Sequence, residues 1–129
     1  MAIKKSGSAK WYDTLKTGNG FVSTQTGVLA DQPYGFNTRF EDAPGTNPEE
    51  LVAAAHASCF TMALSFKLAE AGFSDGRVTT SAEVTLEKED GGFRVTSSAL
   101  STKGKVEGMD QGKFEELAAD AKENCPISK

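Results

Sequence analysis

The sequence predicts an α+β domain in which an antiparallel sheet packs against a long central helix and a second, shorter helix. Three observations support this prediction. Strand signals fill the first forty residues, a long apolar helix begins near residue 48, and a hairpin pattern precedes a second amphipathic helix. Strands and helices that occur in separate runs are typical of α+β proteins. No repeat or linker divides the 129 residues, so we expect one domain spanning residues 1–129.

The N-terminal part of the chain carries three strand signals. Residues 9–12, 20–24 and 34–40 are rich in aromatic and β-branched side chains, and turn-forming residues separate the three segments. This pattern predicts an antiparallel meander. Arg39 falls in the third predicted strand, close to the start of the long helix.

The long helix is predicted from Pro48 to about Gly72. Asn47 is a good N-cap, Pro48 suits the first helical position, and Gly72 is a natural residue to follow a helix end. These limits give about 24 residues and a length of about 36 Å. The middle of the segment is apolar nearly all round, so we expect the helix to be buried on most sides.

The C-terminal half predicts a hairpin followed by a helix. Strands at 78–88 and 93–103 flank a turn that contains two glycines, and alternating apolar residues define an inner face. A second helix after Asp110 places apolar side chains at helical spacing up to Cys125, and Pro126 ends it.

Composition limits the classes of partner. Apolar residues make up 38% of the chain and charged residues 25%, which is typical of a globular protein. The net charge is -4 and the basic residues are scattered, which disfavours nucleic acid as a partner. We expect a cytoplasmic protein without a membrane partner, because no segment is predicted to approach membrane-spanning length.

Function depends on how the two cysteines are interpreted. Helical phase turns both Cys59 and Cys125 inward, so the two thiols can meet if their helices pack together. Cys59 shares its helix row with four apolar residues: Val52, Ala55, Met62 and Phe66. The residues alone leave several alternatives open. Each cysteine can be a small buried hydrophobe, and His56 can join them in a zinc site or pair with Cys59 in a hydrolase.

Four motifs, in order along the chain, resemble the OsmC/Ohr family of osmotically inducible and organic hydroperoxide resistance proteins. The resemblance extends from Lys5 to Ser128. The motifs are QPYGFNTRFE at 32–41, GTNPEEL at 45–51, AAHASCF at 54–60 and NCPIS at 124–128. The family resemblance implies an OsmC-like fold, an intertwined homodimer with active sites at the interface, and no metal, flavin or haem cofactor. It also implies a last strand beyond the Cys-Pro motif, which this sequence, ending at Lys129, does not include.

The resemblance further implies a peroxidase. Cys59 matches the cysteine that attacks an organic hydroperoxide, Cys125 matches the cysteine that closes a transient disulfide, and Arg39 and Glu49 match the ion pair beside them. The implied reductant is a dithiol such as dihydrolipoamide or a lipoylated protein. The arginine lies in the segment that the OsmC branch uses, since the hydroperoxide resistance proteins carry theirs near the N-terminus, where this chain has Lys16.

The chemistry explains why these residue types are needed. Only a thiolate attacks a peroxide, and burial would raise the pKa of Cys59, so a fixed cation such as Arg39 must oppose that effect. Glu49 would hold Arg39 through an ion pair. Ten residues of helix separate Glu49 from Cys59 by about 15 Å, so either Arg39 spans the gap or Glu49 of one subunit approaches Cys59 of the other. We favour the site shared between two subunits. Apolar candidates for a substrate pocket are Phe36, Phe40, Met62, Phe66, Met109 and Phe114. Rival interpretations are a thiol redox sensor and a non-enzymatic ligand-binding dimer.

Overall fold

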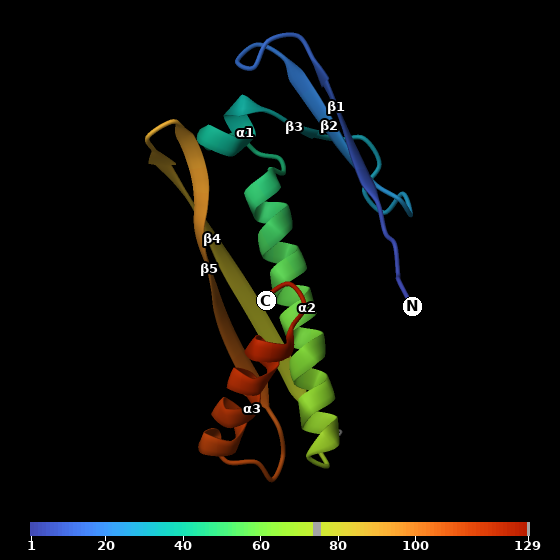
Figure 1. Ribbon diagram of the computed structural model, residues 1–129, viewed down its shortest axis with the longest axis vertical. Helices are drawn as coiled ribbons and strands as arrows, with labels where there is room; N and C mark the ends of the chain where they lie inside the picture. The colour runs from blue at the N-terminus through green and yellow to red at the C-terminus, as the bar shows by residue number, and fades with distance from the viewer. Residues whose placement is uncertain (74–75, 129) are drawn as a thin grey trace. The chain divides into compact units, whose positions relative to one another are not determined.

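The computed structural model describes residues 1–73 and 76–128 and confirms the α+β class. The strands form two antiparallel sheets rather than one: a three-stranded sheet and a two-stranded sheet (Figure 1). The chain folds into two compact units, Met1–Leu51 and Val52–Lys129. The expected single domain stays a prediction. The elements in order are β1 (Gly7–Tyr12), β2 (Asn19–Thr24), β3 (Gln32–Tyr34), α1 (Phe36–Phe40), α2 (Pro48–Glu70), β4 (Arg77–Glu89), β5 (Gly92–Lys105) and α3 (Gln111–Asn124).

The first unit contains the predicted antiparallel meander. The strands β1, β2 and β3 are neighbours in that order, and both pairings are antiparallel. The rings of Trp11 and Tyr34 meet edge to face with their centroids 5.6 Å apart. A Cβ atom at Gly20 would lie only 2.4 Å from the Trp11 ring, so the glycine leaves the space that the indole occupies.

The third predicted strand is wrong in its second half. β3 ends at Tyr34, and the residues that follow form the short helix α1. Gly35 precedes the helix and donates its backbone N–H to the Thr38 hydroxyl at 2.8 Å, while that hydroxyl donates to the Gly35 carbonyl at 3.0 Å. This local pair of hydrogen bonds closes a helical turn, which strand propensity alone does not reveal. Arg39 therefore lies in a helical turn.

The long helix α2 begins and ends close to where the sequence predicts. The Asn47 side-chain oxygen accepts from the Glu50 backbone N–H at 2.8 Å, as expected of an N-cap. Its amide group also donates to the Thr38 carbonyl at 3.0 Å, which ties α1 to the start of α2. At the other end, Gly72 has a φ of 92°, a conformation that glycine adopts without strain.

The core of the second unit lies where α2, α3 and the β4–β5 hairpin meet. The strands β4 and β5 pair antiparallel over almost their whole length, with one irregularity between Thr85 and Leu86. The predicted inner face is confirmed for Ala82, Val84 and Leu86, which alternate with exposed residues along much of β4. The buried side chains of the core are Phe60, Leu64, Leu68, Phe114, Leu117, Ala121 and Cys125. Burial of each large apolar side chain stabilises the fold by about 1.5–3 kcal/mol.

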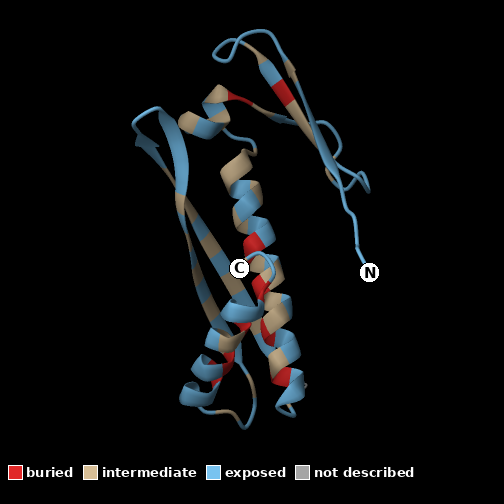
Figure 2. Cartoon of the chain, in the orientation of Figure 1, coloured by how far each residue is buried: buried red, intermediate tan, exposed pale blue. Residues whose placement is uncertain are grey.

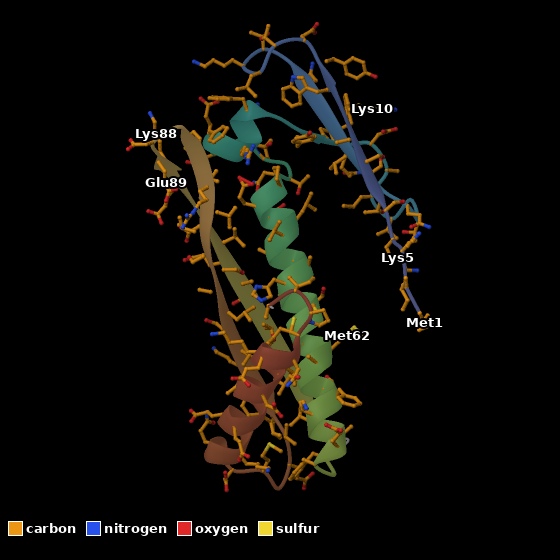
Figure 3. All side chains as sticks on the ribbon, viewed as in Figure 1. Met1, Lys5, Lys10, Met62, Lys88 and Glu89 are labelled. Carbon is orange, nitrogen blue, oxygen red and sulfur yellow. The ribbon has the colours of Figure 1, made fainter. Side chains whose placement is uncertain are left out.

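The helix α2 is buried on one face only, so the expectation that it is buried on most sides is wrong for the single chain. Its buried side chains are His56, Phe60, Leu64 and Leu68 (Figure 2). On another face, Val52, Met62 and Phe66 are 45%, 76% and 62% exposed. Met62 points away from α2 on the side opposite the β4–β5 hairpin (Figure 3). An apolar pattern identifies a face that avoids water, but it does not identify what covers that face.

The sequence interpretation also missed that α2 is long and apolar enough, by length and composition, to cross a membrane. The expectation that no segment approaches such a length is therefore wrong on these two criteria. A single helix of this kind is weak evidence for a membrane span, since core helices of soluble proteins also meet the criteria. Here α2 supplies one face to a core shared with α3 and carries the buried polar residue His56.

Candidate active site

The two cysteines lie together, an arrangement that helical phase allowed. Cys59 occupies the middle of α2, and Cys125 directly follows α3, where its backbone N–H donates to the Ala121 carbonyl at 2.8 Å. Both are free thiols, and their sulfur atoms are 3.0 Å apart. A disulfide bond is about 2.04 Å long, so a movement of about 1 Å would join them. Residues 66 positions apart in the chain thus form one dithiol site.

The two sulfurs differ in their access to solvent. Cys125 is completely buried, whereas Cys59 is half-buried. Cys59 lines an open, mainly apolar groove together with Met62, Ala63, Phe66, Lys67, Asn124 and Pro126. A small molecule that enters this groove therefore meets Cys59 first.

Each thiol also changes the acidity of the other. The hydrogen bond with Cys125 is the main cause that raises the pKa of Cys59; burial raises it further, and the Ile127 backbone N–H opposes both. Burial acts against ionisation of Cys125 as well. The interactions with the Cys59 thiol and with Ser128 outweigh that burial and lower the pKa of Cys125. Within the single chain, the neighbours of Cys59 therefore disfavour its thiolate.

His56 lies one helical turn before Cys59 and is buried. Its Nδ1 atom is 2.6 Å from the Ser98 hydroxyl on β5, and its Nε2 atom is 2.7 Å from the Ser128 hydroxyl. Both ring nitrogens thus have a protein partner. Among residues 1–73 and 76–128, no group of three or more histidine, cysteine, aspartate or glutamate side chains is arranged to hold a metal ion.

The predicted ion pair forms within the first unit. The Arg39 Nε atom donates to Glu49 Oε1 at 2.7 Å, joining α1 to the first turn of α2. The guanidinium carbon also lies 5.3 Å from the centre of the Phe40 ring. The Glu49 carboxylate is largely covered, and the Arg39 side chain is 37% exposed. The carboxylate of the pair is therefore covered, while part of the Arg39 side chain remains accessible to solvent.

The predicted pocket residues separate into three groups. Met62 and Phe66 line the groove beside Cys59. Phe114 is buried in the core, and Met109 packs against that core. Phe36 and Phe40 belong to α1, where their ring centroids are 5.0 Å apart.

Several residues of the site were missed in the sequence. Lys67 and Ala63 lie in the groove because they follow Cys59 at helical spacing, a signal that was available. Ser98 and Ser128 reach His56 from a strand and from the C-terminal turn. Their contacts depend on tertiary packing, so no spacing in the sequence could have revealed them.

Comparison with known protein families identifies this arrangement. The model of the family of OsmC-like proteins matches residues 40–129, which contain both cysteines, His56 and Glu49. The chain belongs to the OsmC-like family. The chain is also 52% identical over 128 residues to the peroxiredoxin OsmC of Escherichia coli strain K12, covering 99% of this chain and 90% of that protein.

The family includes more distant relatives of the same fold. The organic hydroperoxide resistance protein OhrB of Bacillus subtilis is 33% identical over 112 residues, which are 85% of this chain and 79% of that protein. The crystal structure of OhrB matches 95% of this chain and 87% of its own with a TM-score of 0.68. An OsmC-like protein of unknown function from Vibrio cholerae, 19% identical, matches with a TM-score of 0.77 over 98% of this chain and 92% of its own. The OsmC-like fold predicted from the four motifs is thus confirmed.

Proposed function

We propose that this protein is a thiol-dependent peroxidase that reduces organic hydroperoxides to alcohols in defence against peroxides. The observation that carries the proposal is the pair of free thiols 3.0 Å apart, one facing an apolar groove and the other buried behind it. Relatives across nearly the full length of the chain are named peroxiredoxin and organic hydroperoxide resistance protein. We expect it to act in the cytoplasm, where reductants keep both thiols free between turnovers.

The reaction proceeds in three balanced steps. The Cys59 thiolate attacks the outer peroxide oxygen, the O–O bond breaks, and the alkoxide takes a proton and leaves as the alcohol. Cys59 is then a sulfenic acid. The Cys125 sulfur displaces the hydroxyl group, which leaves as water, and a disulfide forms. A dithiol such as dihydrolipoamide or a lipoylated protein reopens the disulfide by exchange and is itself oxidised.

The first step needs a cation near Cys59, because its neighbours in the single chain raise its pKa. Arg39, held by Glu49, is the cation that we assign to this role. Glu49 and Cys59 lie ten residues apart on the continuous helix α2, which separates them by about 15 Å. We therefore infer an intertwined homodimer in which Arg39 and Glu49 of one subunit approach Cys59 of the other.

The exposed apolar face of α2 supports this dimer. Val52, Met62 and Phe66 lie exposed on the helix that carries Cys59, and a large exposed apolar surface is typical of a protein interface. A second copy that covers Met62 and Phe66 would also close the groove over Cys59 and exclude water from it. Dimer formation would then complete the substrate pocket.

The experiment is rapid mixing of reduced protein with cumene hydroperoxide or with hydrogen peroxide, followed by thiol loss. We expect faster loss with the organic peroxide, no reaction in Cys59→Ser, and a single turnover in Cys125→Ser. Arg39→Gln should slow the first step, whereas the matched change Arg94→Gln, at an exposed ion pair with Glu89, should not. Peroxide consumption by Cys59→Ser at the wild-type rate would contradict the proposal.

The same variants separate the two rival functions. A ligand-binding dimer would bind hydroperoxide without consuming it and would keep that binding in Cys59→Ser. A redox sensor would form the disulfide once, but a dithiol would not restore repeated turnover.

A further inference from the structure

The C-terminal turn that follows Cys125 is fastened to α2 by a chain of hydrogen bonds. Ser98 Oγ lies 2.6 Å from His56 Nδ1, and His56 Nε2 lies 2.7 Å from Ser128 Oγ. Ser128 is also among the groups that lower the pKa of the Cys125 thiol. The chain of hydrogen bonds therefore begins on β5, passes through the buried imidazole, and ends at Ser128, three residues after the sulfur that closes the disulfide.

One assignment of donors and acceptors directs this chain of hydrogen bonds toward Cys125. A serine hydroxyl has one hydrogen to donate, and a neutral imidazole has one N–H and one acceptor nitrogen. If Ser128 donates to the Cys125 sulfur, its oxygen accepts from His56 Nε2–H. His56 Nδ1 is then the acceptor, and the Ser98 hydroxyl donates to it. Every group is satisfied with a neutral histidine, and the last hydrogen points at Cys125.

We propose that His56 is a positioning residue for the disulfide-closing step, because it orients the Ser128 hydroxyl so that this hydroxyl donates to the Cys125 thiolate. This inference rests on the proposed peroxidase function and concerns its second step alone. Ser128 contacts the reacting sulfur directly, whereas His56 acts through Ser128.

Disulfide closure needs such a donor because the partners of the Cys125 sulfur change once Cys59 has reacted with the peroxide. In the reduced protein, the Cys59 thiol is one of the groups that stabilise a Cys125 thiolate. Once Cys59 is a sulfenic acid, that thiol is consumed and the remaining donors named for Cys125 come from the turn: the Ser128 hydroxyl and the backbone N–H groups of Ile127 and Ser128. The hydrogen bond between Ser128 and His56 anchors the turn that carries these groups to α2.

The burial of the two groups fits this role. Cys125 is completely buried, so water cannot replace a lost donor at its sulfur. The titratable groups of α2 that face the site are Cys59 and His56. Lys67 lies at the same groove and is paired with Asp120 of α3 at 3.3 Å. The hydroxyl of Ser128 is thus a neutral donor that works without changing the net charge of the site.

The test separates disulfide closure from peroxide attack. Reduced protein is mixed with one equivalent of cumene hydroperoxide, samples are quenched over time, and mass spectrometry measures the sulfenic acid, trapped with dimedone, and the disulfide. In Ser128→Ala we expect the sulfenic acid to form at the wild-type rate and the disulfide to close at least about tenfold more slowly, from the loss of one hydrogen bond to a charged group. His56→Ala should act in the same way, and Ser128→Thr, which keeps the hydroxyl, should restore closure.

A pH profile excludes a purely structural effect. Loss of the Ser128 donor raises the pKa of Cys125, so the midpoint of the closure rate should move to higher pH in Ser128→Ala while the profile of the first step stays in place. Ser98→Ala is the matched control, because it removes a hydroxyl from the far side of the imidazole and leaves His56 Nε2 free to donate to Ser128. We expect its closure rate to stay within about twofold of wild type.

Three results would overturn the inference: closure in Ser128→Ala at the wild-type rate and pH midpoint, an equal loss in Ser98→Ala, or an equal slowing of both steps. A wild-type protein that forms neither sulfenic acid nor disulfide would instead overturn the peroxidase function. Thermal unfolding of each variant, compared with wild type, shows whether the substitutions leave the fold intact.

Discussion

The helix α2 has two apolar faces of similar composition, but only one of them is covered by the rest of the chain. On one face, Phe60, Leu64 and Leu68 are buried by the chain's own α3 and hairpin. On the other, Met62 and Phe66 are exposed in the single chain and line the groove at Cys59. Cys59 lies between the two faces and is half-buried. The first face holds the fold together, and we assign the second to a second subunit and the substrate.

The largest expected effect is on the covered face. Leu64 is completely buried, so Leu64→Ala should leave a cavity and lower the free energy of unfolding by about 2–5 kcal/mol. Met62→Ala removes a side chain of similar size from the exposed face of the same helix and should cost the isolated subunit less than about 1 kcal/mol. Denaturant unfolding at a protein concentration low enough to separate the subunits measures both. Equal losses of unfolding free energy in the two variants would contradict the assignment of one face to the core and the other to the surface of the single chain.

The second prediction concerns assembly through the exposed face. Phe66→Glu places a charge on the proposed interface and should convert the proposed dimer to a folded monomer at micromolar concentration, because an unpaired charge in an apolar interface is strongly unfavourable. Analytical ultracentrifugation measures the mass, and circular dichroism checks the helices. The control is Leu15→Glu, which introduces the same charge at another exposed apolar residue, one that lies outside α2. A Phe66→Glu protein that remains a dimer would contradict our assignment of this face.

The third prediction concerns how the covered face is built. A Cβ atom at Gly104 on β5 would lie 2.2 Å from the Phe114 ring, which packs in the core beside α2. Gly104→Ala should therefore displace that ring and cost about 1–3 kcal/mol of unfolding free energy. Gly112→Ala is the matched control, since the nearest atom to its Cβ would be 3.6 Å away. An equal loss of stability in both variants would show that Phe114 adjusts without cost.

The comparison of faces also shows how far sequence reasoning reaches. The limits of α2, its Asn47 cap and the hairpin were predictable because each depends on neighbouring residues. The meeting of Cys59 with Cys125 was predictable from helical phase together with the family motifs. The short helix that carries Arg39 was not, because one pair of hydrogen bonds between Gly35 and Thr38 decides it.

Burial itself was the least predictable property. The apolar row of Cys59 was predicted to be core because apolar periodicity indicates which side chains avoid water. Periodicity does not indicate whether the same chain or a second molecule covers them. The same limit applies to His56, whose hydroxyl partners come from positions 42 and 72 residues away in the chain.

The smallest expected effect is on the acidity of Cys59, where the two faces meet. The hydrogen bond with Cys125 is the main cause that raises the pKa of Cys59, so Cys125→Ala should lower that pKa and make Cys59 ionise at lower pH. The ultraviolet absorbance of the thiolate, followed against pH, then reports Cys59 alone. In the same Cys125→Ala protein, Arg39→Gln should move the titration back to higher pH if the arginine of the second subunit stabilises the thiolate. Because that stabilisation requires the dimer, the shift should shrink as dilution separates the subunits, and a shift that is independent of dilution would place Arg39 beside Cys59 of its own chain.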